Sequence, residues 1–167
     1  NITMNPEMII EQLGLQKHPE GGWFSEIYRS NEIIQKASLP ARYSDDHCFS
    51  TSIYFLLKSG EISMFHRLKS DEIWHFYSGS PILLISINKN RQLQEAILGS
   101  NIEKGELMQY VFSAGSWFAA KPIKENSYSL IGCTVAPGFE YQDFELADRA
   151  SLIKEYPMYE KIIKEFT

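Results

Sequence analysis

The stretch Gly60-Glu-Ile-Ser-Met-Phe-His66-Arg-Leu-Lys-Ser-Asp-Glu72-Ile-Trp-His-Phe-Tyr-Ser-Gly79 decides the fold of this chain. Its two ends are rich in aromatic and β-branched residues, and its middle is polar. That pattern is typical of two short strands that meet at a turn. His66 and Glu72 stand six residues apart within it, and a glycine marks each end. The stretch therefore predicts two short strands, joined by a polar turn, that carry an imidazole and a carboxylate.

The same kind of pattern continues on both sides, from Phe49 to about Phe144. Short apolar runs alternate with turn residues such as Ser78-Gly-Ser-Pro81 and Lys104-Gly105. Many short strands at such intervals favour a β-sandwich or jelly roll over alternating β/α units. The predicted strands are 51–57, 61–66, 72–77, 82–87, 92–98, 108–112, 117–120, 127–135 and 141–144.

Helices are predicted at both ends of the chain. Asn5 and Pro6 begin a helical pattern that Gly14 ends, and a turn at 18–22 leads into a strand at 23–29. Asp148 caps a helix at 149–155, and Pro157 opens a last helix at 158–166. Without a linker or repeat, residues 1–167 are expected to form one domain, with a barrel core at about 22–146 and C-terminal helices at about 148–166.

Charge and composition exclude several classes of partner. The net charge of −5 and the pI near 5.4 argue against nucleic acid, which needs clustered Lys and Arg. The apolar runs are too short to span a bilayer, and no secretory signal is visible, so a cytoplasmic protein is expected. Cys48 and Cys133 follow no metal or redox spacing and favour a reducing compartment, although a disulfide between them stays open.

The opening stretch resembles the first signature of the cupin superfamily. Gly60, His66, Glu72 and Gly79 match the conserved positions of that signature, while Leu68 replaces its second histidine. A second cupin signature is matched only at its glycine. There Gly115 keeps its place, Ser113 replaces the proline, Phe118 stands where the histidine is expected, and Pro122 replaces the asparagine.

A wider set of motifs resembles one cupin subfamily, labelled a predicted sugar epimerase. The resemblance implies a double-stranded β-helix barrel, an all-β jelly roll, and a homodimer. The label rests on fold similarity to dTDP-4-dehydrorhamnose 3,5-epimerases, and fold alone does not establish function. The motifs are His18-Pro-Glu-Gly-Gly-Trp-Phe, Phe65-His-Arg-Leu-Lys-Ser-Asp-Glu-Ile-Trp-His, Gly115-Ser-Trp-Phe-Ala and Gly132-Cys-Thr-Val-Ala-Pro-Gly-Phe.

His66 and Glu72 are the candidate chemical groups. The resemblance implies a divalent metal held by three histidines and a glutamate, of which this chain keeps two, so any metal bound by His66 and Glu72 is expected to be weakly held. Without a metal, His66 is either a structural partner of Glu72 or a general base whose pKa that carboxylate raises. Such a base suits proton abstraction next to a ketone.

Further residues are predicted to surround a ligand. Trp74 and Phe76 share the face of Glu72 along one strand and are expected to form cavity walls. An epimerase also needs a proton donor, for which Tyr128 and Tyr28 are candidates that spacing does not distinguish. The predicted ligand-binding residues are Ser63, Trp74, Phe76, Arg29 and Phe118, and Arg29 and Arg67 are candidates for binding a diphosphate.

The leading hypothesis is an enzyme, an epimerase or isomerase that acts on a small carbohydrate-like or carbonyl ligand inside the barrel. One alternative is a non-catalytic binder of the same kind of ligand. Another is a cupin enzyme that uses a weakly bound divalent metal.

Overall fold

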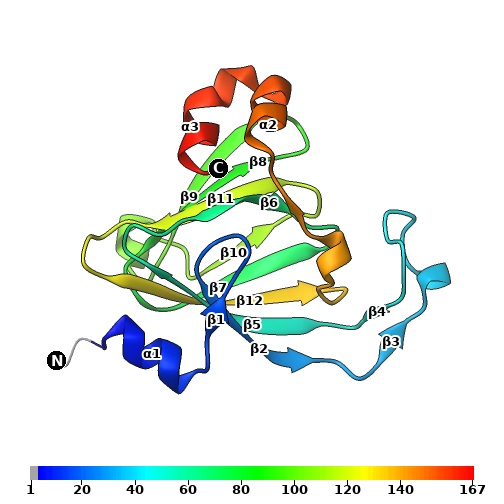
Figure 1. The fold of residues 1–167 in the computed structure, drawn as a ribbon, viewed down its shortest axis with the longest axis horizontal. Coiled ribbons are helices and arrows are strands. Elements are labelled where there is room, and N and C mark those ends of the chain that lie inside the picture. The colour runs from blue at the N-terminus through cyan, green and yellow to red at the C-terminus, as the bar shows by residue number, and fades with distance from the viewer. Residues whose placement is uncertain (1–3) are drawn as a thin grey trace.

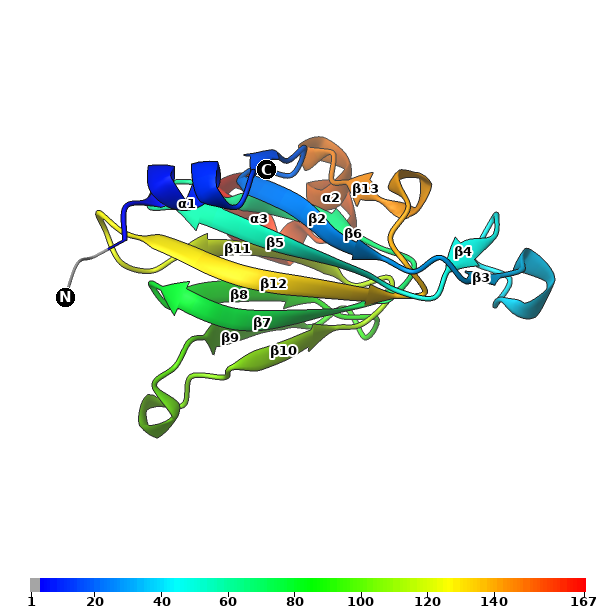
Figure 2. The same ribbon diagram turned by 90° about the horizontal axis from the view of Figure 1, so that it is seen from below.

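Two antiparallel β-sheets face each other in the computed structural model, which describes residues 4–167 (Figures 1 and 2). The six-stranded sheet has the order β1 (Gln16–Lys17), β2 (Trp23–Arg29), β5 (Thr51–Lys58), β12 (Tyr128–Ala136), β7 (Asp71–Gly79) and β10 (Gln109–Phe112). The five-stranded sheet has the order β13 (Glu145–Leu146), β6 (Ser63–Arg67), β11 (Trp117–Pro122), β8 (Ile82–Ile87) and β9 (Leu93–Leu98). This arrangement confirms the predicted all-β cupin fold.

The hydrophobic core lies between the two sheets. Along β12, Ile131 and Cys133 are buried in this core, while Leu130 packs on the outer face of the sheet. Side chains of a strand point alternately to its two faces, and this alternation places Glu72 and Trp74 of β7 on the inner face. The largest fully buried side chains of the core include Phe55, Trp74, Phe112 and Phe118.

Helix α1 (Pro6–Gln12) covers part of the outer face of the six-stranded sheet. Its cap is the predicted one, because the side chain of Asn5 accepts a hydrogen bond from the N–H of Glu7. Ile9 packs there against Leu56 and Leu130. The helix therefore joins the terminus to the sheet through apolar burial.

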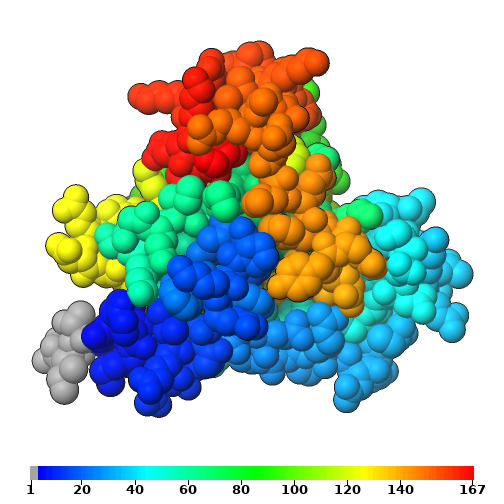
Figure 3. Space-filling view, in the orientation of Figure 1, coloured from blue at the N-terminus to red at the C-terminus, as the bar shows by residue number. Residues whose placement is uncertain are grey.

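Helices α2 (Arg149–Glu155) and α3 (Glu160–Glu165) cover the outer face of the five-stranded sheet (Figures 1 and 3). The carboxylate of Asp148 caps α2 by accepting the N–H of Ser151. A 3₁₀ helix, η4 (Pro157–Tyr159), stands where the second terminal helix was predicted to begin. Among residues 4–167, no helix has the length and apolar character that crossing a membrane requires.

One prediction about local structure is wrong. Residues 141–144 do not form a strand. They form the 3₁₀ helix η3 (Tyr141–Asp143), because the N–H of Asp143 bonds back to Glu140. Of the three tryptophans, only Trp74 lies in the core between the sheets, since Trp23 packs near α1 and Trp117 lies under the C-terminal helices.

A small two-stranded sheet, β3 (Ile33–Ile34) with β4 (His47–Cys48), projects from the end of the sandwich (Figure 2). The segment between its strands contains the 3₁₀ helix η1 (Lys36–Ser38). Cys48 and Cys133 are both buried free thiols, so the disulfide that the sequence left open is not formed.

The turn between β1 and β2 enters the space beside β6. The carbonyl oxygen of Glu20 accepts the N–H of Met64 at 2.8 Å, which ties the turn to β6. Gly21 has a φ of 104°, and a Cβ at this residue would overlap the carbonyl oxygen of Ile62. Only glycine fits this close approach of two backbones.

We expect Gly21→Ala to lower the free energy of unfolding by on the order of 3 kcal/mol, since it combines an unfavourable φ with a backbone clash. Gly14→Ala is the matched control, because Gly14 also has a positive φ, 62°, but has open space around its Cα. We expect that control to lose about 1 kcal/mol. Urea unfolding measures both values, and equal losses would contradict the role of the close approach.

Candidate functional site

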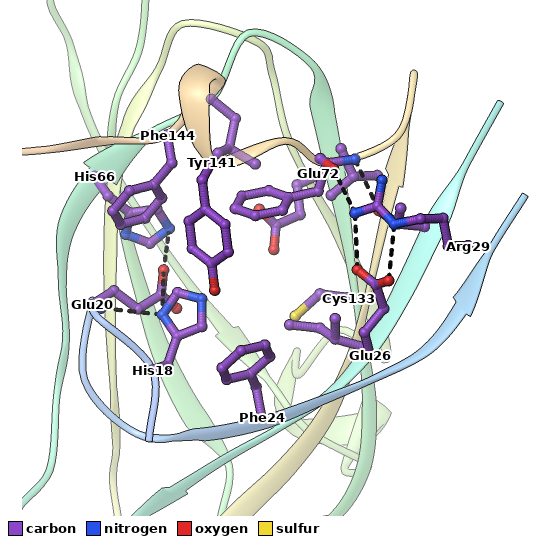
Figure 4. A pocket seen from close by; sticks show the side chains of 15 residues that line it. His18, Glu20, Phe24, Glu26, Arg29, His66, Glu72, Cys133, Tyr141 and Phe144 are labelled. Atoms are coloured by element: carbon purple, nitrogen blue, oxygen red, sulfur yellow. Dashed lines mark hydrogen bonds and ion pairs between the residues drawn. The ribbon is translucent and has the colours of Figure 1, made fainter. Parts of the chain in front are cut away.

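A cavity opens between the two sheets, on the side where the β1–β2 turn meets the segment that follows β12 (Figure 4). Its volume is about 80 Å³, counted as the space open to the centres of water molecules, so it suits a small ligand. Aromatic rings form much of its wall, namely Phe24, Phe139, Tyr141 and Phe144. Its ionisable polar side chains include His18, Glu20, Glu26, Arg29, His66 and Glu72, and Thr51 adds a hydroxyl group.

An ion pair between Glu20 and His66 forms one side of the cavity. Nε2 of His66 lies 2.8 Å from Oε2 of Glu20, and both side chains are more than nine-tenths buried. The other ring nitrogen, Nδ1, donates to the carbonyl oxygen of Met64 at 2.7 Å. Both nitrogens therefore have acceptors, an arrangement that favours the imidazolium form.

Burial and charge shift the pKa values of this pair in opposite directions. Burial by itself lowers the pKa of His66, but the carboxylate of Glu20, with help from Glu72, raises it above the ordinary value. Burial by itself raises the pKa of Glu20, yet the charge and hydrogen bond of His66 lower it below the ordinary value. Glu20 is thus held ionised next to a protonated His66.

Glu72 occupies a different environment on the same cavity. Burial, and then the negative charge of Glu20, raise its pKa to about 7. Its Oε1 accepts the indole N–H of Trp74 at 2.8 Å, which fixes the carboxyl group. Burial and the nearby Glu72 also raise the pKa of the Cys133 thiol well above its ordinary value, as expected for an inert thiol.

Arg29 is held by neighbours on the rim. Its Nε and Nη2 donate to the two carboxylate oxygens of Glu26 at 2.9 and 3.1 Å. Its Nη1 donates to Glu140 at 2.8 Å, and its Nη2 donates to the carbonyl oxygen of Phe139 at 2.9 Å. The guanidinium group therefore fastens the segment after β12 to β2.

A second buried pair fastens the same segment further along. Nε2 of His47 lies 2.5 Å from Oδ2 of Asp143, and Nδ1 of His47 contacts the carbonyl oxygen of Asp45 at 2.8 Å. Burial lowers the pKa of His47, but the hydrogen bonds to Asp143 and Asp45 and the charges of Asp143 and Glu140 together raise it above the ordinary value. Because Tyr141 and Phe144 flank Asp143, this pair helps to position the aromatic wall.

The structure brings some of the predicted residues together and separates others. His66, Glu72 and Arg29 line the cavity, but the direct partner of His66 is Glu20 and not the predicted Glu72. Tyr128 does not line it, because its ring packs on the outer face of the sheet near α1 and its hydroxyl lies 3.4 Å from Ser78.

The remaining predicted ligand-binding residues lie behind the cavity surface. Phe118 is the register partner of His66 across β11 and β6, and the two rings are 4.1 Å apart. Trp74 supports Glu72, and Phe76 packs against the core. Ser63 is fully buried, and its hydroxyl has no hydrogen-bond partner of ordinary geometry within residues 4–167.

Sequence reasoning gave no site role to several residues of the cavity lining, among them His18, Glu20 and Tyr141. His18 and Glu20 belong to the segment that was interpreted as a connecting turn, and Tyr141 to the segment that was predicted as a strand. The available signal was the pair Gly21-Gly22 directly after charged residues. Two adjacent glycines often mark a place where the backbone approaches another segment closely.

The cupin metal site does not fit the residues present. Leu68 and Phe118 occupy two of the four implied ligand positions and have no atom that binds a metal. His66 uses both ring nitrogens in hydrogen bonds, and Glu72 uses one oxygen for Trp74. Across residues 4–167, no three or more His, Cys, Asp and Glu side chains are arranged to hold an ion.

Comparisons with known proteins agree with this architecture. A profile of the family described as the cupin superfamily (DUF985) matches residues 7–147. The chain therefore belongs to this cupin family. An uncharacterized protein of Saccharomyces cerevisiae, YML079W, is 26% identical over 147 residues, which cover 82% of this chain and 72% of the yeast protein.

Solved structures give the same result. A hypothetical protein from Leishmania major has a TM-score of 0.89 at 33% identity, covering 98% of this chain and 99% of that one. The protein SO0799 from Shewanella oneidensis has a TM-score of 0.86 at 33% identity, covering 99% and 98%. Oxalate decarboxylase from Bacillus subtilis, at 12% identity and a TM-score of 0.55, shares the fold over 90% of this chain and 36% of its own.

We expect protein purified without chelator or added metal to contain far less than one divalent ion per chain, because the cavity lacks a ligand set. Elemental mass spectrometry measures this directly. Near-stoichiometric metal that Glu72→Gln removes would contradict the conclusion that the site does not fit a cupin metal.

The raised pKa of Glu72 predicts a dependence of stability on pH. The folded state holds this proton up to about pH 7, whereas the ordinary value is 4.5, so the folded state binds more protons between these values. The contribution of Glu72 to stability is therefore greatest below pH 4.5 and falls as the pH rises, by on the order of 3 kcal/mol in total.

Glu72→Gln removes this titration and keeps an acceptor for Trp74. We expect the variant to become progressively more stable than the unmodified protein as the pH rises through this range, and urea unfolding at several pH values measures the difference. A difference that stays constant with pH would show that Glu72 does not titrate in this way.

Proposed function

We propose that the protein binds a small carbonyl compound, carbohydrate-like in size and polarity, and moves a proton on the carbon next to its carbonyl group. This is the chemistry of an epimerase or isomerase. The observation that carries the proposal is that the pKa values of two carboxyl groups on one cavity are shifted in opposite directions. Glu20 is held ionised by His66, while Glu72 keeps its proton up to about pH 7.

Such a separation of pKa values assigns an acceptor and a donor for protons. Glu20, as a carboxylate, takes the proton from the carbon of the ligand, and Glu72, as a carboxylic acid, returns one. The donor of this scheme is thus Glu72, in place of the tyrosine that the sequence suggested. His66 does not act as the free base that the sequence suggested, because Glu20 and Met64 occupy both of its nitrogens. It positions Glu20 and balances its charge.

The surroundings of the pair suit this chemistry. Four aromatic rings lie in the cavity wall, and removal of water strengthens the interaction of each charge with the reacting atoms. A donor with a pKa near neutrality combines a useful protonated fraction with a good driving force for proton transfer. Both features support catalysis more directly than they support simple binding.

A non-catalytic binder of the same ligand is the second candidate. It is favoured by the complete hydrogen bonding of His66, which is also the pattern of a buried structural pair. The two functions differ in one observable, the exchange of hydrogen at the carbon next to the carbonyl group.

The test is an exchange experiment in heavy water. We expect the protein to accelerate deuterium incorporation next to the carbonyl group of at least one compound in a panel of reducing sugars and small hydroxyketones, followed by proton NMR. Glu20→Gln and Glu72→Gln should each slow this exchange by about 100-fold or more, the usual contribution of one acid or base.

Glu145→Gln is the matched control, because Glu145 is an exposed carboxylate that pairs with Arg67 outside the cavity lining. It should leave the exchange rate within about twofold, as expected for an exposed ion pair. Saturable binding without exchange would support the binder. Exchange that survives both cavity substitutions would contradict the roles of Glu20 and Glu72.

A further inference from the structure

We infer that His18 is the group that binds the carbonyl oxygen of the ligand, through its Nε2–H, and that this ligand carries no negative charge. The inference rests on the proposed function and deepens it, since it names a third reacting group and the class of substrate. It follows from the hydrogen bonds of His18 and from the fact that the N–H groups of Arg29 and His66 already donate to protein acceptors.

The backbone determines which nitrogen of His18 carries the hydrogen. Nδ1 lies 3.1 Å from the backbone nitrogen of Glu20. Because a backbone N–H can only donate a hydrogen bond, Nδ1 must be the acceptor. A neutral imidazole that accepts at Nδ1 carries its hydrogen on Nε2. The turn that places Glu20 on the cavity therefore also determines the tautomer of His18.

The same environment keeps this ring neutral. Phe24 packs against it at 4.7 Å between ring centroids, with Phe55 and Phe144 also within 6 Å. Burial lowers the pKa of His18, and the opposing charge of Glu20 does not overcome this effect. His18 is thus an uncharged donor, whereas His66 is a charged one.

The Nε2–H of His18 is available to a ligand. Among residues 4–167, no hydrogen-bond partner of this atom is found, and it is not fully enclosed by protein. In Figure 4 the second ring nitrogen of His18 lies on the side away from Glu20, toward the interior of the cavity. The free donor and the carboxylate of Glu20 are therefore presented to the same ligand.

The cations of the cavity have no hydrogen-bond donor left for an anion. Arg29 has five N–H groups, and all five are used, by both oxygens of Glu26, by Glu140, by the carbonyl oxygen of Phe139 and by the sulfur of Cys48. His66 uses both of its N–H groups as well. No further Lys or Arg occurs in the lining that the structure describes.

Carboxylates already balance these cations around the space that the ligand would occupy. Glu20 pairs with His66 and Glu26 with Arg29, and the third carboxyl group of the lining, Glu72, keeps its proton up to about pH 7. A phosphate or nucleotide group would meet like charges without a free donor to compensate, which is strongly unfavourable in a buried site. An uncharged hydroxyketone or free sugar meets no such penalty.

In the proposed reaction, one proton leaves the carbon beside the carbonyl group and another returns to it. The carboxylate of Glu20 takes the hydrogen from the carbon beside the carbonyl group, and the C–H electron pair becomes the carbon–carbon double bond of an enolate. The displaced π pair moves to the oxygen, where the Nε2–H of His18 stabilises the new charge. Glu72 donates its proton to the carbon, the carbonyl group re-forms, and solvent returns both carboxyl groups to their starting states.

The first test determines the tautomer of His18 and the class of ligand by NMR of protein labelled with ¹⁵N in its histidines. His18 is assigned by substitution and should be neutral with its hydrogen on Nε2 at pH 7. Dihydroxyacetone, free xylose or free glucose should shift this resonance saturably, whereas dihydroxyacetone phosphate at equal concentration should not.

The second test uses two substitutions that separate the nitrogens of His18. The side-chain oxygen of His18→Asn can replace Nδ1 as acceptor for the turn but leaves no Nε2 donor, whereas the amide of His18→Gln can supply a donor near the position of Nε2. We expect His18→Asn to slow deuterium exchange about 100-fold or more, the usual loss on removal of one such donor. His18→Gln should stay within about tenfold of the unmodified protein.

Three results of the NMR test would overturn the inference: a hydrogen on Nδ1, tighter binding of the phosphorylated compound, or no shift with any uncharged compound. Exchange that His18→Asn leaves unchanged would also overturn it, while the proposed function would stand. If the uncharged compounds shift the resonance and no exchange occurs, the proposed function fails and the binding role of His18 survives.

Discussion

The buried ion pair between Glu20 and His66 is the interaction on which the site depends. It joins the β1–β2 turn to the centre of β6, two segments that are far apart in the sequence, and it does so inside an apolar cavity. A buried charge without its partner is strongly unfavourable, so each member requires the other. The close approach at Gly21 and the bond from Met64 to Glu20 hold the turn at the distance that the pair needs.

This pair also determines the chemistry of its neighbours. The negative charge of Glu20 adds to burial in raising the pKa of Glu72, and the backbone that carries Glu20 sets the tautomer of His18. One short turn therefore influences the protonation of three groups on the cavity. Glu20 is ionised, Glu72 keeps its proton up to about pH 7, and His18 is neutral with its hydrogen on Nε2. In cupins that hold a metal, an ion provides the central positive charge. In this chain His66 provides it, with Phe118 packed on its ring in place of a ligand.

Local features of the sequence were sufficient to predict much of the fold. The strand predicted at 82–87 and the helix predicted at 149–155 have the predicted bounds, and Asn5 and Asp148 cap their helices. These features depend on periodicity and capping, which act over a few residues. The strand predicted at 141–144 was wrong because Asp143 turns inward to His47, a partner 96 positions away. No local pattern contains that contact.

For the site, the sequence by itself predicted that His66 and Glu72 lie on two strands joined by a turn, that Leu68 and Phe118 replace two metal ligands, and that the whole is a cupin barrel. Only the tertiary structure decided that Glu20 is the partner of His66, that Tyr128 faces away, and that Arg29 has no donor left for an anion. The reason is physical. Alternation along a strand is a property of the local backbone, whereas a pKa or a hydrogen bond depends on groups that folding brings together from distant parts of the chain.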